Sequence, residues 1–321
     1  MSHQRYPSHD PIKEPHAVSI KVLRLSRPSL VTQHPIESPC SLLSTSQCTA
    51  PASLAYRSDK TKADSVPFVL SPILNLPVSF GSAYVGETFS CTLCANNDLT
   101  AETPKRIRDV RITAEMKTPG LAAAQPLELR PTGDDGTDLE AGETLQKVLS
   151  FDLKEEGNHV LAVTVSYYEA SDTSGRTRTF RKLYQFICKA SLVVRTKVGV
   201  VSMSKEAEQE GKRAGGRRWV LEAQLENCSE EVVQLEKVAM ELEPGLKCQD
   251  CNWEVSGSEK PVLHSGEVEQ VCFIIDDEAK ERNDGTTDQR ITFGVLGIGW
   301  RGQMGNKGFL STGKLGTRVT R

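Results

Sequence analysis

Residues 68–98, FVLSPILNLPVSFGSAYVGETFSCTLCANND, constrain the fold of this chain more than any other stretch. Two apolar runs flank a centre rich in turn residues, where Gly81, Gly86 and Glu87 predict a bend. Asn96, Asn97 and Asp98 then end the second run. Alternation with Gly and Asn punctuation is typical of a half-buried strand in an antiparallel sandwich. The residues predicted to face the core are Phe89, Cys91, Leu93 and Ala95.

The same alternation recurs along the chain without amphipathic helices between the runs. The predicted strands are 18–25, 107–117, 145–153, 159–168, 180–190, 192–201, 219–227, 232–242, 272–275 and 291–300. The strand 159–168 has the clearest pattern, and its predicted core residues are Leu161, Val163, Val165 and Tyr167. Short strands at regular spacing predict an all-β fold built from sandwiches.

In the strand 107–117 one alternating set is mostly apolar and is predicted to face the core. That set consists of Arg108, Val110, Ile112, Ala114 and Met116.

The order of turns repeats within the chain. A strand ends at Asn97, another strand follows, and a Gly142-Glu143 turn leads into a third. The same order recurs at Asn227 and Gly266-Glu267. In addition, the segment from Glu155 to Leu161 resembles the corner-and-strand pattern of immunoglobulin domains, with His159 where the corner tyrosine would stand. These features predict tandem immunoglobulin-like β-sandwich domains.

A length of 321 residues favours about two domains. We expect a disordered tail at 1–17, a first sandwich domain at 18–190 and a second at 191–321. The stretch 31–67 is rich in Ser, Pro and Thr and is expected to be a low-complexity, disordered insertion in the first domain.

Charge and hydropathy exclude several classes of protein. The net charge is −3, with both signs dispersed along the sequence, which argues against general binding to nucleic acid. No stretch approaches the roughly 20 apolar residues of a membrane span. The first thirty residues lack the apolar core of a signal peptide, so none is expected.

Nine cysteines is an odd number, and several of them fall inside predicted strands. Reduced thiols in a cytosolic protein explain this better than a secreted disulfide framework. We therefore expect all nine to be free.

Two Cys-x-x-Cys pairs raise a zinc or dithiol hypothesis: Cys91 with Cys94, and Cys248 with Cys251. A zinc site needs both thiolates to converge on one ion. An offset of three in a strand instead sends Cys91 and Cys94 to opposite faces. A dithiol redox motif would need a following helix, so neither hypothesis is favoured.

The other polar clusters are also better explained as solvated or structural residues than as binding or catalytic sites. The acidic loops 134–140 and 276–288 lack the spacing of calcium-binding loops and are expected to be solvated. His159 and His264 are the histidines placed in folded segments, and neither has an evident nucleophile or acid partner in sequence. The basic run Lys212, Arg213, Arg217 and Arg218 is expected to be an exposed loop. The sequence therefore predicts no catalytic, cofactor-binding or metal-binding residue.

Several stretches together resemble the subunit 13 family of the trafficking protein particle (TRAPP) complex. They are SIKVLRLSRPSL (19–30), LNLPVSFGSAYVGETFSCTLCANND (74–98), GETLQKVLSFDLKEEGNHVLAVTVSYY (142–168), FRKLYQFICKASLVVRTK (180–197) and WVLEAQLENCSEEVVQLEKVAMEL (219–242). The resemblance implies a further sandwich domain past Arg321, so a third domain is expected to be missing from this chain.

The resemblance also implies a function. It points to a non-catalytic accessory subunit of a tethering complex that is a guanine-nucleotide exchange factor for a Rab GTPase, in endoplasmic reticulum-to-Golgi transport and autophagy. The implied partners are other TRAPP subunits and, indirectly, the Rab. The implied location is cytoplasmic, on Golgi or intermediate-compartment membranes through the complex, and no cofactor is implied. The alternatives are an immunoglobulin-like adhesion or ligand-binding module unrelated to trafficking, and an enzyme with a cysteine metal site on a sandwich scaffold.

Overall fold

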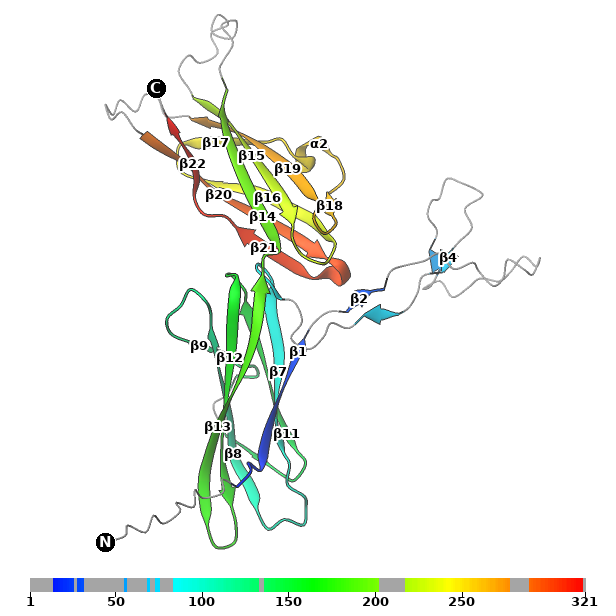
Figure 1. The fold of residues 1–321 in the computed structure, drawn as a ribbon, viewed down its shortest axis with the longest axis vertical. Helices are drawn as coiled ribbons and strands as arrows, with labels where there is room; N and C mark the ends of the chain where they lie inside the picture. Colours follow the sequence, from blue (N-terminus) through cyan, green and yellow to red (C-terminus); the bar gives the residue numbers. More distant parts are fainter. Residues whose placement is uncertain are drawn as a thin grey trace, which may run out of the picture. The chain divides into compact units, whose positions relative to one another are not determined.

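The computed structural model describes residues 14–25, 28–31, 55–56, 68–69, 73–75, 83–132, 136–201, 217–277 and 289–319. Within these ranges nearly every regular element is a strand (Figure 1). The helical elements described are one short α-helix, α2 (Trp253–Ser256), and one 3-10 turn, η2 (Gln303–Gly305). The predicted all-β fold class is confirmed.

The described residues divide into two compact units. The first unit contains those in the ranges 14–25, 89–151 and 157–186, and the second contains the rest, mainly from residue 187 onward. The domain limits predicted from the sequence, 18–190 and 191–321, remain a proposal. Most of the predicted insertion lies outside the described residues; within its range, β3 (Ala55–Tyr56) pairs with β4 (Phe68–Val69).

Two sheets build the first sandwich. One has the order β1-β7-β11, and the other has the order β10-β8-β12-β13, with β9 also on β8; β6 pairs in parallel with Cys188 and Lys189 at the end of β13, and these residues belong to the second unit. The bounds of these strands are β1 (Val18–Leu25), β6 (Ala83–Tyr84), β7 (Thr88–Asn97), β8 (Arg106–Lys117), β9 (Gln125–Leu127), β10 (Thr137–Leu139), β11 (Thr144–Asp152), β12 (Gly157–Ala170) and β13 (Gly175–Lys189). Three of them, β9, β10 and the two-residue β6, were not predicted as strands, because they are too short to show a period.

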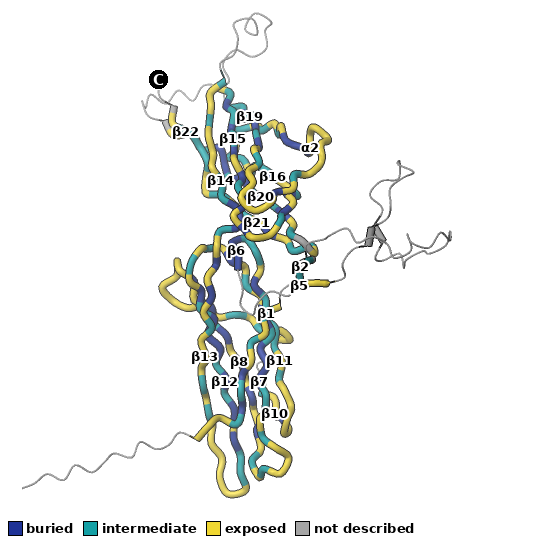
Figure 2. Tube along the Cα trace, turned by 45° about the vertical axis from the view of Figure 1, so that its right-hand side comes forward, coloured by how far each residue is buried: buried dark blue, intermediate teal, exposed yellow. Residues whose placement is uncertain are grey.

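The core of the first unit follows the predicted alternation. Burial alternates along β7, β8 and β12, as the colours along the tube show (Figure 2). Rings from the two sheets meet in it: Phe89 of β7 stacks on Phe186 of β13 with centroids 4.7 Å apart. The predicted core residues that are buried are Phe89, Cys91, Leu93, Ala95, Leu161, Val163, Val165 and Tyr167.

The prediction for β8 was wrong at two neighbouring positions. Ile107 is buried and Arg108 is exposed, the reverse of the predicted faces. The cause is a β-bulge, because Arg108 pairs with Tyr168 while Arg111 pairs with Ser166, so β8 has one more residue than β12 in between. Asp109 in this bulge has φ 50°. One extra residue exchanges the faces on either side of a bulge.

The second unit also has two main sheets, with the orders β14-β15-β19-β17 and β18-β16-β20-β21, and β22 also pairs with β20. Its strands are β14 (Leu192–Val200), β15 (Arg218–Asn227), β16 (Val233–Leu242), β17 (Leu246–Asp250), β18 (Val262–Leu263), β19 (Val268–Asp277), β20 (Gln289–Gly302), β21 (Lys307–Ser311) and β22 (Leu315–Val319). Its core includes Trp219 on β15 and Phe293 on β20, with ring centroids 5.3 Å apart. A separate small pair is β2 (Ser29–Leu30) with β5 (Leu74–Asn75).

The pairing order of the first unit recurs in the second. The neighbours β1-β7-β11 correspond to β14-β15-β19, and the neighbours β10-β8-β12 correspond to β18-β16-β20. Even the register agrees at the strand ends, since Val18 pairs with Asn97 and Leu192 pairs with Asn227. The predicted internal repeat is therefore present as a repeat of strand pairing. The immunoglobulin-like assignment remains a prediction.

Candidate functional site

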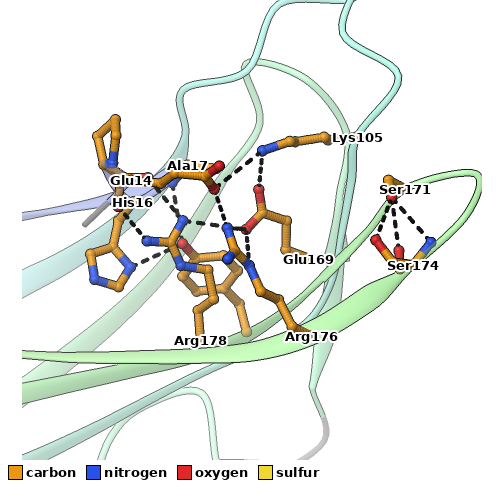
Figure 3. Close-up of polar contacts among 11 residues, drawn as sticks. Glu14, His16, Ala17, Lys105, Glu169, Ser171, Ser174, Arg176 and Arg178 are labelled. Carbon is orange, nitrogen blue, oxygen red and sulfur yellow. Dashed lines mark hydrogen bonds and ion pairs between the residues drawn. The ribbon is translucent and has the colours of Figure 1, made fainter. Parts of the chain in front are cut away.

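The largest group of linked charges in the described part of the chain surrounds Glu169, near the end of β12. This Glu169 cluster consists of Glu14, Lys105, Glu169, Arg176 and Arg178 (Figure 3). The Glu169 side chain is only 5% exposed, although a carboxylate normally faces water. It accepts a hydrogen bond of 2.7 Å from Lys105 Nζ and longer ones of 3.3–3.4 Å from Arg178 and Arg176. Three cations therefore compensate one buried anion.

The Glu169 cluster also holds the residues that precede β1. Arg178 donates to the backbone carbonyl oxygens of Pro15, at 2.8 Å, and Glu14, at 2.6 Å. Arg176 forms an ion pair with the Glu14 side chain. Glu14 and Pro15, which fall in the tail predicted from the sequence, are thus hydrogen-bonded to β13.

A tyrosine hydroxyl adds a second attachment beside the cluster. Ala17 N donates to the Tyr167 hydroxyl at 3.2 Å, and His16 Nδ1 lies 3.0 Å from the same oxygen. The His16 ring also lies 4.7 Å from the ring of Phe180. Two neighbouring strands, β12 and β13, therefore fix the start of β1.

Electrostatics give the cluster fixed charges. Burial alone would raise the pKa of Glu169, but hydrogen bonds from Lys105 and Arg178 outweigh it and hold the pKa below its ordinary value. Burial, assisted by Arg178, lowers the pKa of His16. At neutral pH Glu169 is therefore ionised and His16 is neutral. A general acid or base works best with a pKa near the operating pH. The pKa values of Glu169 and His16 are both shifted further below pH 7, so these residues are suited to anchoring the segment before β1 rather than to proton transfer.

This cluster was not found from the sequence. The available signal was a glutamate before the Ser171–Ser174 turn and an Arg-x-Arg after it, because opposite charges across a hairpin stabilise the pair of strands. The third cation, Lys105, lies 64 residues before Glu169 and only the fold brings it there.

The predicted Asn and Gly-Glu turns form one buried arrangement, here called the asparagine turn, and it occurs in both units. In the first unit Asn97 Nδ2 donates to the carbonyl oxygens of Leu139, at 3.0 Å, and Glu140, at 2.9 Å. Gly142 N in turn donates to Asn97 O at 3.1 Å, and Asn97 N donates to Glu143 O at 2.9 Å.

The second unit repeats these contacts with other residues. Asn227 Nδ2 donates to the carbonyl oxygens of Leu263, at 3.0 Å, and Glu231, at 2.9 Å. Gly266 N donates to Asn227 O at 2.7 Å, and Asn227 N donates to Glu267 O at 3.0 Å.

The backbone conformation of the asparagine turns requires glycine at Gly142 and Gly266. Gly142 has φ 82° and Gly266 has φ 81°, a left-handed region that residues with a Cβ rarely occupy. Each following glutamate accepts a backbone hydrogen bond at the same place, from Glu140 N to Glu143 and from His264 N to Glu267. The asparagine turns satisfy buried backbone groups and are structural.

Cys91 and Cys94 lie in the two opposite alternating sets of β7, as the strand geometry predicts. The seven cysteines in the described ranges carry free thiols, while Cys40 and Cys48 lie outside those ranges. Cys91 belongs to the inward set of β7, and Cys94, opposite Lys21 of β1, belongs to the other set. Both are nevertheless buried, and burial raises the pKa of the Cys91 thiol to about 12. No group of three or more metal-ligating side chains is found among the described residues.

The two histidines singled out from the sequence take structural positions. His159 is fully buried in β12, where Nδ1 lies 3.2 Å from Gly157 O and the ring stacks on Phe186 at 5.5 Å. His264 lies in the asparagine turn of the second unit, where its backbone N donates to Glu267 Oε2 at 2.7 Å.

The predicted solvated loops lie partly beyond the described ranges. Residues 134–135 and 278–288 of the acidic loops and Lys212 and Arg213 of the basic run are outside them. Arg218 is within β15 and pairs with Asp276 of β19 at 2.6 Å.

Exposed apolar side chains are the remaining candidates for a binding surface. On β13, Leu183 and Ile187 are 62% and 64% exposed, and on β1, Leu23 and Leu25 are more than half exposed. Phe309 on β21 is 61% exposed. Apolar side chains of this size on regular strands are suited to contacts with other proteins. No helix among the described residues has the length and hydropathy that crossing a membrane requires.

Comparisons with known proteins give a consistent result. A sequence model of trafficking protein particle complex subunit 13, N-terminal, matches residues 16–188, and a model of the middle domain of the same subunit matches residues 192–320. The Xenopus laevis trafficking protein particle complex subunit 13 is 26% identical over 318 residues, which span 94% of this chain and 69% of the relative. The probable homolog from Drosophila melanogaster is 28% identical over 312 residues, or 94% of this chain and 64% of the relative.

Solved structures are similar only at a low level. The match to a Porphyromonas gingivalis W83 protein of unknown function spans 74% of this chain and 94% of that protein, with 9% identity and a TM-score of 0.21. The Salmonella enterica SafA pilin in complex with the SafB chaperone covers 74% of this chain and is covered to 92%, with 10% identity and a TM-score of 0.23. Scores this low support no inference about this chain.

Proposed function

This chain belongs to the subunit 13 family of the trafficking protein particle complex, and from that premise we propose that it is a non-catalytic accessory subunit of a TRAPP-type tethering complex. The complex is proposed to act as a Rab guanine-nucleotide exchange factor in endoplasmic reticulum-to-Golgi transport and autophagy. The observation that carries the proposal is the succession of two matches, 16–188 and 192–320, to consecutive parts of one family.

The proposed partners are other subunits of the complex, and the chain would meet the Rab only indirectly. Its location would then be cytoplasmic and peripheral to Golgi membranes through the complex. The exposed side chains Leu23, Leu25, Leu183 and Ile187 support a role in protein binding, because burying apolar area is the main driving force of association. The polar clusters of the described residues, in contrast, are satisfied internally and are suited to stabilising the sandwiches.

An adhesion or ligand-binding module unrelated to trafficking is the alternative. Sandwich architecture alone would fit it equally well, because one fold hosts many functions. The family matches favour the trafficking role, since they rest on sequence along most of the chain.

Co-purification tests the proposal. The full chain with an affinity tag should recover other TRAPP subunits from cells, in amounts that persist after stringent washing. The matched control is a Val163→Asp chain, whose first unit should be unable to form its core. Recovery of no TRAPP subunit by the folded chain would contradict the assignment.

Nucleotide exchange on the Rab tests the non-catalytic role separately. The isolated chain should leave the rate of nucleotide release unchanged, while the purified complex accelerates it. Acceleration by the isolated chain would overturn the non-catalytic role and leave the family membership intact.

A further inference from the structure

Two cysteines lie directly opposite each other on neighbouring strands of the second unit. The register of β17 on β19 pairs Cys248 with Ile275 and Asp250 with Phe273, so one step further places Cys251 opposite Cys272. A backbone hydrogen bond of 3.2 Å from Cys251 N to Cys272 O continues the ladder to this pair. Residues directly opposite each other in an antiparallel pair have Cα atoms about 4.5–5.5 Å apart. That separation is within the range of disulfides, about 4.4–6.8 Å.

The register places the two thiols on the same, outward face of the sheet. In β19 the inward residues are Val271 and Phe273, both buried, so Cys272 between them points outward and is half-buried. Cys251 is exposed, and its thiol donates a long hydrogen bond of 3.8 Å to Gln249 O.

Neighbouring side chains fix the backbone around the pair. Asn252 Oδ1 accepts a hydrogen bond of 2.8 Å from Cys272 N. Asp250 Oδ1 accepts two from Asn252, from the backbone N at 2.8 Å and from Nδ2 at 2.6 Å. The pair is therefore held in register from both strands.

From this geometry we propose that Cys251 and Cys272 are a thiol-oxidation site at which a small disulfide such as oxidised glutathione closes a reversible cross-strand disulfide. The exposed Cys251 thiolate attacks one sulfur of the small disulfide, and one small thiolate leaves. The Cys272 thiolate then attacks the Cys251 sulfur, forms the protein S–S bond and releases the second small thiolate. Two protein thiols are oxidised, one small disulfide is reduced, and the two protons pass to the released thiolates.

The order of attack follows from the surroundings of each sulfur. Burial, followed by the neighbouring Cys251 and Glu222, raises the pKa of Cys272. A thiol with a raised pKa is a poor first nucleophile in water but can resolve a mixed disulfide held beside it. Cys248 is a weaker partner, because it lies opposite Ile275 and packs against the core.

The test uses the full chain with Cys40, Cys48 and Cys228 changed to Ser, incubated with oxidised glutathione and then alkylated. Before alkylation the intact mass should fall by about 2 Da relative to the reduced chain, with no retained glutathione, because two hydrogens are lost. Cleavage after glutamate without reductant should leave residues 242–254 linked to residues 270–278. A dithiol reductant should restore both thiols.

Three variants identify which cysteines form the bridge and which one attacks first. Cys248→Ser should still form the bridge, and Cys251→Ser should not. Cys272→Ser should retain glutathione on Cys251, because the second thiol that releases it is gone. The proposal is overturned if both thiols stay free at every glutathione ratio, if the bridge is internal to residues 242–254, or if Cys272→Ser still forms a bridge.

Discussion

Single residues show how this fold admits polar groups into its interior. Glu169 and the two asparagines of the asparagine turns are each at most 5% exposed, and each has several partners. Leaving a buried polar group unpaired costs about 1–3 kcal/mol, more for a charge. Substitutions that remove these partners, or that add a charge without any, should therefore be among the most damaging in the chain.

Replacing Glu169 with Gln should destabilise the first unit at neutral pH by roughly 1.5–3 kcal/mol, the usual contribution of hydrogen bonds to a charged group. Since the folded pKa of Glu169 is lowered, its stabilisation is present above the unfolded pKa and is lost as the pH falls through the folded pKa. The deficit of Glu169→Gln should thus shrink below about pH 4.5. Urea unfolding from pH 7 to pH 3 measures it.

The control for that series is Glu115→Gln. Glu115 pairs with Arg181 at 2.8 Å, but its side chain is 44% exposed. An exposed ion pair contributes about 0–1 kcal/mol. A pH dependence in Glu115→Gln equal to that of Glu169→Gln would show that burial is not the cause.

Val163→Asp should unfold or severely destabilise the first unit. Val163 is fully buried in β12, so the new carboxylate would have no partner and would cost several kcal/mol, a large part of a domain's stability. Thr164→Asp, one residue along and only half-buried, should be milder. Circular dichroism during thermal unfolding compares them. A cooperatively folded, soluble Val163→Asp protein would contradict the assigned core face.

Elements show a second regularity, the repeat of the asparagine turn. Asn97→Ala and Asn227→Ala should each cost about 1–3 kcal/mol, because one buried and one partly buried carbonyl group lose their donor. Asn96→Ala is the matched control: its side chain donates one long hydrogen bond of 3.5 Å to Cys94 O and accepts one of 2.8 Å from the Thr144 hydroxyl in an exposed contact. Chemical denaturation of the three variants measures the effects. Equal losses for Asn96 and Asn97 would count against the structural role of the turn.

The sequence predicted those elements whose period was long enough to read. Strands such as β7 and β12 have alternating apolar residues over several positions, and their buried faces were correct. The repeated order of Asn and Gly-Glu turns also agreed with the structure, because both depend on local backbone conformation. The two-residue strands β6 and β18 have no readable period.

Features that depend on tertiary contacts could not be predicted. The bulge in β8 exchanged the faces of Ile107 and Arg108. The residue in the bulge is an aspartate, Asp109, and nothing in the sequence around it marks a bulge. The Glu169 cluster needs Lys105, Glu14 and Arg178 from separate segments. The proximity of Cys251 and Cys272 likewise follows from the register of two strands.

At the scale of the whole molecule, the chain belongs to the subunit 13 family of the trafficking protein particle complex, so its exposed apolar side chains are the first residues to test for binding to other subunits. Leu183→Glu should reduce recovery of TRAPP subunits in co-purification at least several-fold, because it replaces exposed apolar area with a charge. Gln185→Glu adds the same charge on the same face of β13 without removing apolar area. Equal recovery by both variants and the unchanged chain would exclude this part of β13 as a contact.

The asparagine turns also have a consequence for how the chain reaches its fold. Asn97 and Leu139 are 42 positions apart, and Asn227 and Leu263 are 36 apart, so each amide waits for a distant segment to arrive. The entropy of closing such loops is lost before their hydrogen bonds form. We therefore expect the turns to form after the folding transition state, so that Asn97→Ala and Asn227→Ala accelerate unfolding and leave the refolding rate nearly unchanged.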